Sequence, residues 1–242
     1  MSKRQEIRER RRREQIRNRI IVIVLVVMGA LLVAFAFIMP SIATARNAAN
    51  AAKTPVLIVT PRKFNAKVDG VHLGDPNAPV KVDIYEDYRC SACLAYTQGI
   101  EPQVIKNYVE TGKVYYTYHS FIVIDNHDGT DASYRSANAA MCASEQNRFW
   151  DYHATLYANQ ITEDASLYTD TRLVTMAENL KLDMTAFNQC YQAKKYASVV
   201  QKDISAGQSL NITGTPSIFV NGTLVPNFSN AVQAIDSALA GK

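Results

Sequence analysis

The most informative part of the sequence is Val80-Lys81-Val82-Asp83-Ile84-Tyr85, followed two residues later by Tyr88-Arg89-Cys90-Ser91-Ala92-Cys93. The alternating apolar residues of the first segment are typical of a strand, and the residues from Ser91 onward favour a helix. Cys90 and Cys93 therefore lie where the first helical amides lack partners and the helix dipole is positive. This position stabilises a thiolate on Cys90, which Cys93, one turn further on, can attack once it is oxidised. The pair predicts a thiol–disulfide redox site.

The segments on either side of the cysteines predict one α/β domain. Leu94–Glu110 is typical of a helix that Pro102 should kink, and Lys113–His119 is typical of a strand. Strand, helix and strand in this order give a parallel βαβ unit with a right-handed crossover. Further on, the pattern predicts helices over residues 131–210, with an inserted helical subdomain at about 131–195, then a hairpin at Ser217–Val225 and a closing helix at Ala231–Leu239.

The N-terminal part of the chain has the composition of a membrane anchor. Residues 1–19 are basic, and Ile20–Met39 contains no charged residue, so a helix there would cross a hydrocarbon core of roughly 30 Å. The basic flank is expected to stay cytoplasmic, which places everything after Met39 outside the cell membrane. A cleaved signal peptide is the alternative, because Ala43-Thr44-Ala45 resembles a cleavage site. Residues 40–67 are predicted to be a stalk, with Val56–Thr60 as a candidate edge strand, and residues 68–242 the folded domain.

The net charge of the chain does not indicate a nucleic-acid partner. The formal charge is +4, but residues 1–19 hold nine Lys or Arg against three Glu, a surplus of six. The rest of the chain therefore carries 4 − 6 = −2. Because the surplus of basic residues is confined to the tail, it is explained by membrane topology and indicates no nucleic-acid surface on the domain.

Two further cysteines, Cys142 and Cys190, lie on predicted helices of the insertion. Four cysteines in all suit an oxidising compartment outside the membrane. If Cys90 pairs with Cys93, the other two are left either to form a structural bridge, to remain as buried free thiols, or to act as a second redox pair. We favour the structural bridge. The four histidines are scattered along the chain, so the sequence predicts no metal site and no cofactor.

Several motifs together resemble those of DsbA-like proteins, which are extracytoplasmic thiol–disulfide oxidoreductases with a thioredoxin fold and a helical insertion. The resemblance covers about Val68–Leu239 and rests on four segments in the same order: Gly74-Asp75-Pro76-Asn77-Ala78-Pro79, the strand into Cys90-Ser91-Ala92-Cys93, Phe149-Trp150-Asp151-Tyr152-His153, and Gly214-Thr215-Pro216-Ser217-Ile218-Phe219-Val220-Asn221-Gly222. A CxxC alone is a weak signal, whereas a CxxC at a strand-to-helix junction with a distant Gly-Thr-Pro is specific.

The resemblance implies a role for each of four site residues. Cys90 matches the exposed nucleophile of the family, and Cys93 matches the more buried resolving cysteine. Thr215 and Pro216 match the cis-proline loop that faces the redox pair and presents backbone groups to a substrate.

The sequence departs from the family pattern at two places. The buried acid that assists proton transfer in the family lies six residues before the first cysteine, where this chain has Ile84. Asp83 and Glu86 are the candidate substitutes, although strand alternation directs Asp83 to the opposite face. The dipeptide between the cysteines is Ser-Ala and lacks the histidine of the strongest oxidants, so we expect a less oxidising couple than the extreme of the family.

These observations predict a membrane-anchored enzyme that introduces disulfides into secreted or surface proteins. Its expected partners are substrate proteins with free thiols and an integral-membrane protein of the DsbB or vitamin K epoxide reductase-like type, which would reoxidise the Cys90–Cys93 pair. Within the same chemistry, the alternative is an isomerase or reductase of client disulfides. From another class, the alternative is a membrane-tethered module that binds client proteins and has only secondary redox activity.

Overall fold

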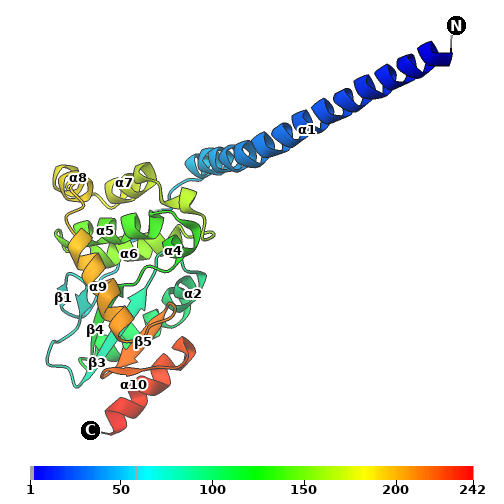
Figure 1. Cartoon of the computed structure of the whole chain (residues 1–242). Helices are drawn as coiled ribbons and strands as arrows, with labels where there is room; N and C mark the ends of the chain where they lie inside the picture. The colour runs from blue at the N-terminus through cyan, green and yellow to red at the C-terminus, as the bar shows by residue number, and fades with distance from the viewer. Residues whose placement is uncertain (1–2, 58, 242) are drawn as a thin grey trace. The chain divides into compact units, whose positions relative to one another are not determined.

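The computed structural model describes residues 3–57 and 59–241 (Figure 1). The chain divides into two units, with the boundary between Ala51 and Ala52. The first unit is helical and belongs to α1 (Lys3–Lys53). Among the described residues, one helical stretch, Arg12–Phe37, is long and apolar enough to cross a membrane, and its mean hydropathy reaches 3.2. This agrees with the predicted apolar helix, although a signal sequence would have the same properties.

The second unit is an α/β domain built on a six-stranded sheet in the order β1-β2-β4-β3-β5-β6. The central strands β3 (Val80–Glu86) and β4 (Val114–Ser120) are parallel, whereas β5 (Ser217–Val220) pairs antiparallel with β3. The edge strands, β1 (Val68–Asp69), β2 (His72–Leu73) and β6 (Thr223–Leu224), are short and antiparallel to their neighbours. The predicted βαβ unit and hairpin are both confirmed.

The crossover from β3 to β4 is helical but interrupted, as Pro102 predicts. It consists of α2 (Ser91–Gly99), α3 (Glu101–Val104) and a π-helical turn, η1 (Ile105–Val109). The break falls at Ile100, two residues before the proline, which has no N–H to continue the preceding helix. Glu101, directly after the break, is buried, so the interruption turns a carboxylate into the interior.

The helices predicted over residues 131–210 are present between β4 and β5, and one short helix that was not predicted, α4 (Ile124–Asp128), precedes them. The helices after α4 are α5 (Ala132–Ser144), α6 (Phe149–Ala158), η2 (Ala165–Tyr168), α7 (Asp170–Asn179), α8 (Met184–Gln192) and α9 (Ala197–Ser209). Figure 1 shows α7 and α8 on the side of α5 and α6 away from the sheet. After β6, a turn η3 (Phe228–Asn230) leads into α10 (Ala231–Ala240), which packs on β5 and β3.

Helix α9 closes the face of the sheet that carries Tyr85. Tyr85, Phe121, Ile212 and Phe219 form one buried apolar cluster on this side. Gly207 of α9 lies directly over Phe121, where a Cβ atom would stand 2.5 Å from the Phe121 ring. A larger residue would force the helix and the ring apart, so glycine permits this close packing.

The segment expected to be a stalk, residues 40–67, has two different parts in the structure. Helix α1 continues to Lys53, and the residues after it hydrogen-bond to the domain. The Leu57 amide donates to Asn159 Oδ1 at 2.8 Å, and the Arg62 amide donates to Asp151 Oδ1 at 3.0 Å. The prediction of a strand at Val56–Thr60 is wrong, because the described residues of this segment form no strand; Ile58 lies outside the described residues. Side chains of α6 satisfy backbone groups here, so no strand pairing is needed.

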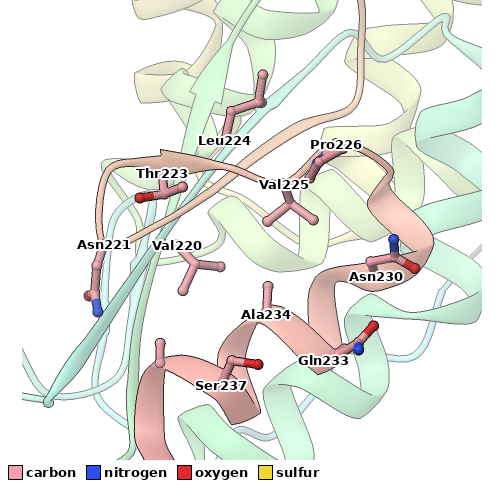
Figure 2. A pocket seen from close by; sticks show the side chains of 11 residues that line it. Val220, Asn221, Thr223, Leu224, Val225, Pro226, Asn230, Gln233, Ala234 and Ser237 are labelled. Atoms are coloured by element: carbon pink, nitrogen blue, oxygen red, sulfur yellow. The ribbon is translucent and has the colours of Figure 1, made fainter. Parts of the chain in front are cut away.

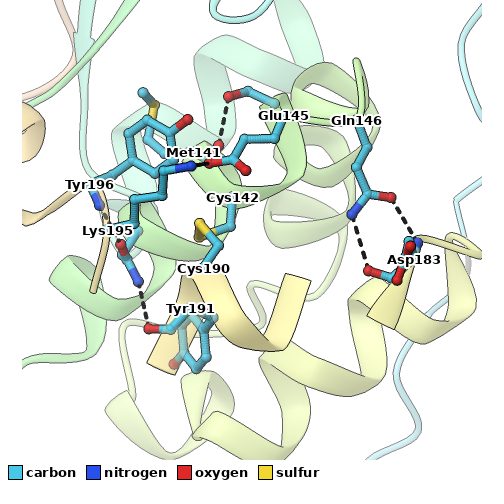
Figure 3. Close-up of a disulfide and its surroundings, with 11 residues drawn as sticks. Met141, Cys142, Glu145, Gln146, Asp183, Cys190, Tyr191, Lys195 and Tyr196 are labelled. Atoms are coloured by element: carbon cyan, nitrogen blue, oxygen red, sulfur yellow. Dashed lines mark hydrogen bonds and ion pairs between the residues drawn. A yellow bond between two sulfur atoms is a disulfide. The ribbon is translucent and has the colours of Figure 1, made fainter. Parts of the chain in front are cut away.

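Cys142 and Cys190 form a disulfide that links α5 to α8 (Figure 3). The ion pair Lys195–Glu145, at 2.7 Å, lies beside the bridge and joins the end of α5 to the residues after α8. The Asp183 amide and carbonyl both bond to the Gln146 side chain, which ties the two helices at a second point. The helical insertion is thus fastened by a covalent bond and by polar contacts between the same two elements.

Replacing Cys142 and Cys190 with alanine should destabilise the domain by about 4 kcal/mol, because a bridge across a 48-residue separation restricts the unfolded chain. Denaturant unfolding of the full-length protein in detergent, followed by near-ultraviolet circular dichroism, would measure the loss. Both proteins should carry Cys90→Ser and Cys93→Ser, so that only one bridge differs. An unchanged free energy of unfolding would contradict the expectation.

Candidate active site

The two remaining cysteines lie at the start of α2. Cys90 is the N-cap residue of the helix, with extended backbone, and its carbonyl accepts the first helical bond from Leu94. Cys93 is one turn further on and is fully buried, whereas Cys90 is partly exposed. Both are free thiols, so the structure represents the reduced form of the pair. Of the two, only Cys90 is positioned to meet a partner from solution.

The loop before β5 faces Cys90. The Thr215–Pro216 peptide bond is cis, as the resemblance implied. The Cys90 thiol donates a hydrogen bond to the Thr215 carbonyl oxygen, with 3.2 Å between sulfur and oxygen. Antiparallel pairing of β3 with β5 places Tyr85 opposite Ser217, so the end of one strand and the start of the other meet at the same edge of the sheet. The structure therefore brings all four residues expected at the site together.

The pKa values of the two thiols are shifted in opposite directions. Hydrogen bonding from Cys93 has the largest effect on the Cys90 pKa, which falls to about 6; partial burial opposes the shift, and the backbone amides of Ala92 and Cys93 assist it. Burial raises the Cys93 pKa well above its usual range, and the hydrogen bond with Cys90 and the charge of Glu86 raise it further. At neutral pH the pair therefore holds one thiolate, on Cys90, and one proton, on Cys93.

The site contains a buried carboxyl group, but it lies at a different position in the sequence from the buried acid of the family. Ile84 and Glu86 are both fully buried, and a strand period of two places them on the same face of β3. Burial raises the Glu86 pKa well above its usual range, with the neighbouring Glu101 charge as the second cause. Asp83 points to the other face and contacts His119. Of the two candidate substitutes, Glu86 is the one whose charge acts on Cys93.

A buried arginine fixes the residues before Cys90. The Arg89 guanidinium donates to Asp125 Oδ1 at 2.8 Å and to Asp128 Oδ2 at 2.5 Å, and its Nε donates to the Glu163 carbonyl at 2.9 Å. The Gln160 side chain also donates to the Arg89 carbonyl, at 2.7 Å. Sequence reasoning missed this cluster, since the partners of Arg89 lie 36 to 74 residues away from it and share no local pattern with it.

A second carboxylate lies at the start of α2. Glu163 is exposed, and its Oε1 accepts a hydrogen bond from the Ser91 amide at 3.1 Å. This amide belongs to the first turn, whose unpaired N–H groups also stabilise an anion at Cys90. Glu163 therefore competes with the Cys90 thiolate for the positive end of the helix. Nothing in the sequence near residue 163 indicated this placement.

An open groove of about 570 Å³ lies between the β5–β6 hairpin and α10 (Figure 2). Its lining consists of aliphatic, hydroxyl and amide side chains, with Val220, Leu224 and Gln233 among them. None of the lining residues is a cysteine, an acid or a base, so the groove offers no group for thiol exchange. Among the described residues, no group of three or more His, Cys, Asp or Glu side chains could hold a metal ion.

Comparison with known proteins agrees with this geometry. A family profile described as Thioredoxin matches residues 66–238. The chain is 29% identical over 170 residues to the probable disulfide bond formation protein D of Bacillus anthracis, covering 69% of this chain and 77% of that protein. It is 28% identical over 174 residues to disulfide bond formation protein D of Bacillus subtilis strain 168, with 70% and 77% covered. The chain belongs to the thioredoxin family, as a DsbA-like thiol–disulfide oxidoreductase.

Solved structures of DsbA-like oxidoreductases share the architecture of the domain. The oxidised form of BdbD from Bacillus subtilis superposes with a TM-score of 0.64 at 25% identity, covering 75% of this chain and all of that one (100%). DsbA of Chlamydia trachomatis superposes with a TM-score of 0.61 at 20% identity, covering 78% and 98%, and supports the fold alone. In both cases the similarity extends over nearly the whole of the other protein, so the helical insertion is included.

The pH dependence of the DsbA-like couple should reveal the acidic Cys90 thiol. The equilibrium constant for reduction of the disulfide by glutathione should be flat below about pH 6 and then rise about tenfold per pH unit to about pH 8. The sign follows because the reduced form gains stability as Cys90 ionises, whereas Cys93 and glutathione keep their protons. Mass spectrometry of acid-quenched, alkylated samples would give the constants. A curve that stays flat to pH 8 would contradict an acidic Cys90.

Replacing Glu163 with glutamine should lower the Cys90 pKa by about 0.2 to 0.7 pH unit, the range expected for one charge at a helix terminus. The reason is that the Ser91 amide would no longer bond to a competing anion. The rate of Cys90 alkylation by iodoacetamide as a function of pH measures the shift. Glu178→Gln, an exposed charge on α7, is the matched control and should leave the profile unchanged.

Proposed function

We propose that this protein is a membrane-anchored oxidase that introduces disulfides into secreted or surface proteins. The observation that carries the proposal is the acidic thiol of Cys90 at the start of α2, with a Cys90 pKa of about 6. A stabilised thiolate favours the reduced pair, which makes the disulfide form an oxidant of substrate thiols. The Ser91-Ala92 dipeptide between the cysteines lacks the histidine of the strongest oxidants, which supports an oxidant milder than those members.

The reaction proceeds through a mixed disulfide on Cys90. A substrate thiolate attacks the Cys90 sulfur of the Cys90–Cys93 disulfide, so that the S–S bond breaks and Cys93 leaves with the electron pair and takes up a proton. A second substrate thiolate then attacks the substrate sulfur of the mixed disulfide, and Cys90 leaves as a thiolate. The substrate has lost two electrons, which now reside in the reduced pair. Thr215 and Pro216, facing Cys90, form part of the surface that receives the substrate.

We place the catalytic domain outside the cell membrane, with the N-terminus in the cytoplasm. The basic residues before the apolar stretch Arg12–Phe37 support this orientation. A disulfide between Cys142 and Cys190 supports an oxidising compartment. An integral-membrane protein of the DsbB or vitamin K epoxide reductase-like type would then take the two electrons from Cys90 and Cys93, and substrate proteins with free thiols would be the other partners.

Replacing Cys93 with serine should trap substrate proteins in mixed disulfides with Cys90, because the Cys90 thiolate still attacks a substrate disulfide while Cys93 is no longer present to attack the Cys90 sulfur and displace the substrate. Cells producing Cys93→Ser should show thiol-sensitive adducts on a non-reducing gel, and mass spectrometry would identify the attached proteins. Cys90→Ser is the control and should form none. Absence of adducts with Cys93→Ser, together with an intact cellular phenotype for Cys90→Ser, would favour the client-binding module.

Two refolding reactions separate the oxidase from an isomerase or reductase. An oxidase should restore activity to reduced ribonuclease faster than to scrambled ribonuclease, whereas an isomerase would show the opposite preference. The purified full-length protein in detergent, with oxidised or reduced glutathione, is sufficient for both reactions. Two features keep the isomerase or reductase alternative open: Thr215 before Pro216, and the absence of histidine from the Ser91-Ala92 dipeptide.

A further inference from the structure

Three titratable side chains are buried together beneath the cysteine pair. Glu86 on β3, Glu101 on α3 and His153 on α6 have exposed fractions of 0%, 1% and 1%. His153 Nε2 lies 3.5 Å from Glu101 Oε1 and 3.9 Å from Glu86 Oε2, so the imidazole stands between two carboxyl groups from different elements. The reaction described above uses none of the three directly, although the charge of Glu86 acts on Cys93.

The cluster is incompletely hydrogen-bonded. His153 Nδ1 lies 3.2 Å from the Tyr88 hydroxyl, but His153 Nε2, Glu86 Oε2 and Glu101 Oε2 have no hydrogen-bond partner among the described residues. Buried polar atoms without partners are uncommon and costly, and they often mark a functional site. Here the unpartnered atoms belong to groups that can exchange protons, and one nitrogen faces both acids.

The surroundings isolate the cluster from water on most sides. Rings of Tyr88, Tyr118, Phe149, Trp150 and Tyr157 all lie within 6 Å of the His153 ring. The other groups that face the two acids are Cys90, Cys93, Thr97, Tyr96 and Tyr116. Cys93 is itself fully buried, so side chains of the cluster offer its proton a path to solvent that does not require direct contact of Cys93 with water.

The cluster reaches the surface at one end. Arg62 Nη1 lies 3.9 Å from Glu101 Oε2, and the Arg62 side chain is 38% exposed. Glu86 is at the opposite end and is the acid of the two whose charge acts on Cys93, and His153 lies between the two acids. The order of groups is therefore Cys93, Glu86, His153, Glu101 and then the surface beside Arg62.

We propose that His153 and Glu101 relay protons between Glu86 and solvent, and that this relay serves each protonation and deprotonation of Cys93. The proposal rests on the function proposed above, in which Cys93 gains a proton when it leaves the disulfide. Glu86 donates that proton to the Cys93 sulfur and recovers one from His153, which is resupplied through Glu101. When the pair is reoxidised, the Cys93 proton moves to Glu86 as the proton of Glu86 moves on to His153 and out past Glu101. One proton crosses the relay per event, and no electron does.

The second step matters because the surroundings of Glu86 favour its neutral form. Burial raises the Glu86 pKa well above its usual range, with the Glu101 charge as the next cause. A neutral carboxyl group accepts no further proton until its own has moved on. His153 Nε2 lies 3.9 Å from Glu86 Oε2, which makes His153 the residue through which Glu86 loses and regains its proton.

Reaction of the reduced protein with oxidised glutathione tests the relay. Full-length protein in detergent is mixed rapidly with excess oxidised glutathione between pH 5 and pH 9, quenched in acid, and analysed by mass. Attack by Cys90 forms a mixed disulfide with glutathione in a second-order step. Cys93 then attacks the Cys90 sulfur in a first-order closing step, which requires loss of the Cys93 proton and releases glutathione.

His153→Gln and Glu101→Gln should each slow the closing step by about tenfold or more at pH 7, which is less than the roughly 10²–10⁴-fold that a positioned acid–base group contributes, because neither residue contacts the reacting sulfur. Their closing rates should keep rising through pH 9, since Cys93 must then lose its proton directly, whereas the wild-type rate levels off at lower pH. Formation of the mixed disulfide by Cys90 should stay within twofold of wild type. A wild-type closing rate and pH profile in both variants would overturn the proposal.

His119→Gln is the matched control. His119 also lies between two acids, with Asp83 at 3.0 Å and Asp203 at 3.3 Å, but both of its ring nitrogens are paired and it stacks on Tyr85. This variant should change neither step. If His153→Gln fails to fold, Glu101→Asp provides the comparison: it retains the carboxyl group and should close within threefold of wild type, unlike Glu101→Gln. Failure of wild-type Cys90 to form a mixed disulfide would refute the proposed function instead.

Discussion

The structure depends on one constraint: a sulfur anion on Cys90 must be stabilised without a fixed counter-charge. The first turn of α2 and the Cys93 thiol supply this stabilisation through hydrogen bonds, and the Thr215 carbonyl faces the sulfur from across the sheet edge. Strand pairing makes the arrangement possible, because β3 and β5 are neighbours and the loops at their ends meet. The partly exposed Cys90 sulfur therefore faces a backbone carbonyl group of the cis-proline loop.

Residues of the helical insertion fix the segment that joins β3 to Cys90. The carboxylate of Asp87 accepts the amides of Val123 and Ile124, and the Tyr168 hydroxyl donates to the Tyr88 carbonyl at 2.8 Å. Together with the Arg89 cluster, these contacts fix every residue between the end of β3 and Cys90. Removing one partner of a buried ion pair typically costs about 3–5 kcal/mol, so the loop has little freedom to move the sulfur away from the helix axis.

The sequence predicted the parts of the fold and site that depend on local patterns. Alternation in Val80–Tyr85, the CxxC spacing, the interruption at Pro102 and the Gly-Thr-Pro turn each reflect a short-range rule. The buried charges could not be predicted in this way, because Arg89, Glu101 and His153 are stable in the interior only through partners far away in the sequence. The stalk was likewise misjudged in part, since its backbone bonds to side chains about a hundred residues away, as Leu57 does to Asn159.

The displaced acid shows why position in the sequence is a poor guide to chemistry in a buried site. Ile84 occupies the place of the family's acid, yet Glu86 lies two residues further along the same strand face and nearer to the cysteines. Burial raises the Cys93 pKa, and the Glu86 charge raises it further, while hydrogen bonding from Cys93 and from the first amides of α2 lowers the Cys90 pKa. The two thiols, one helical turn apart, therefore differ in acidity because one is buried and the other accepts hydrogen bonds. Because of this difference in acidity, Cys90 is present as the reactive thiolate while Cys93 remains a protonated thiol.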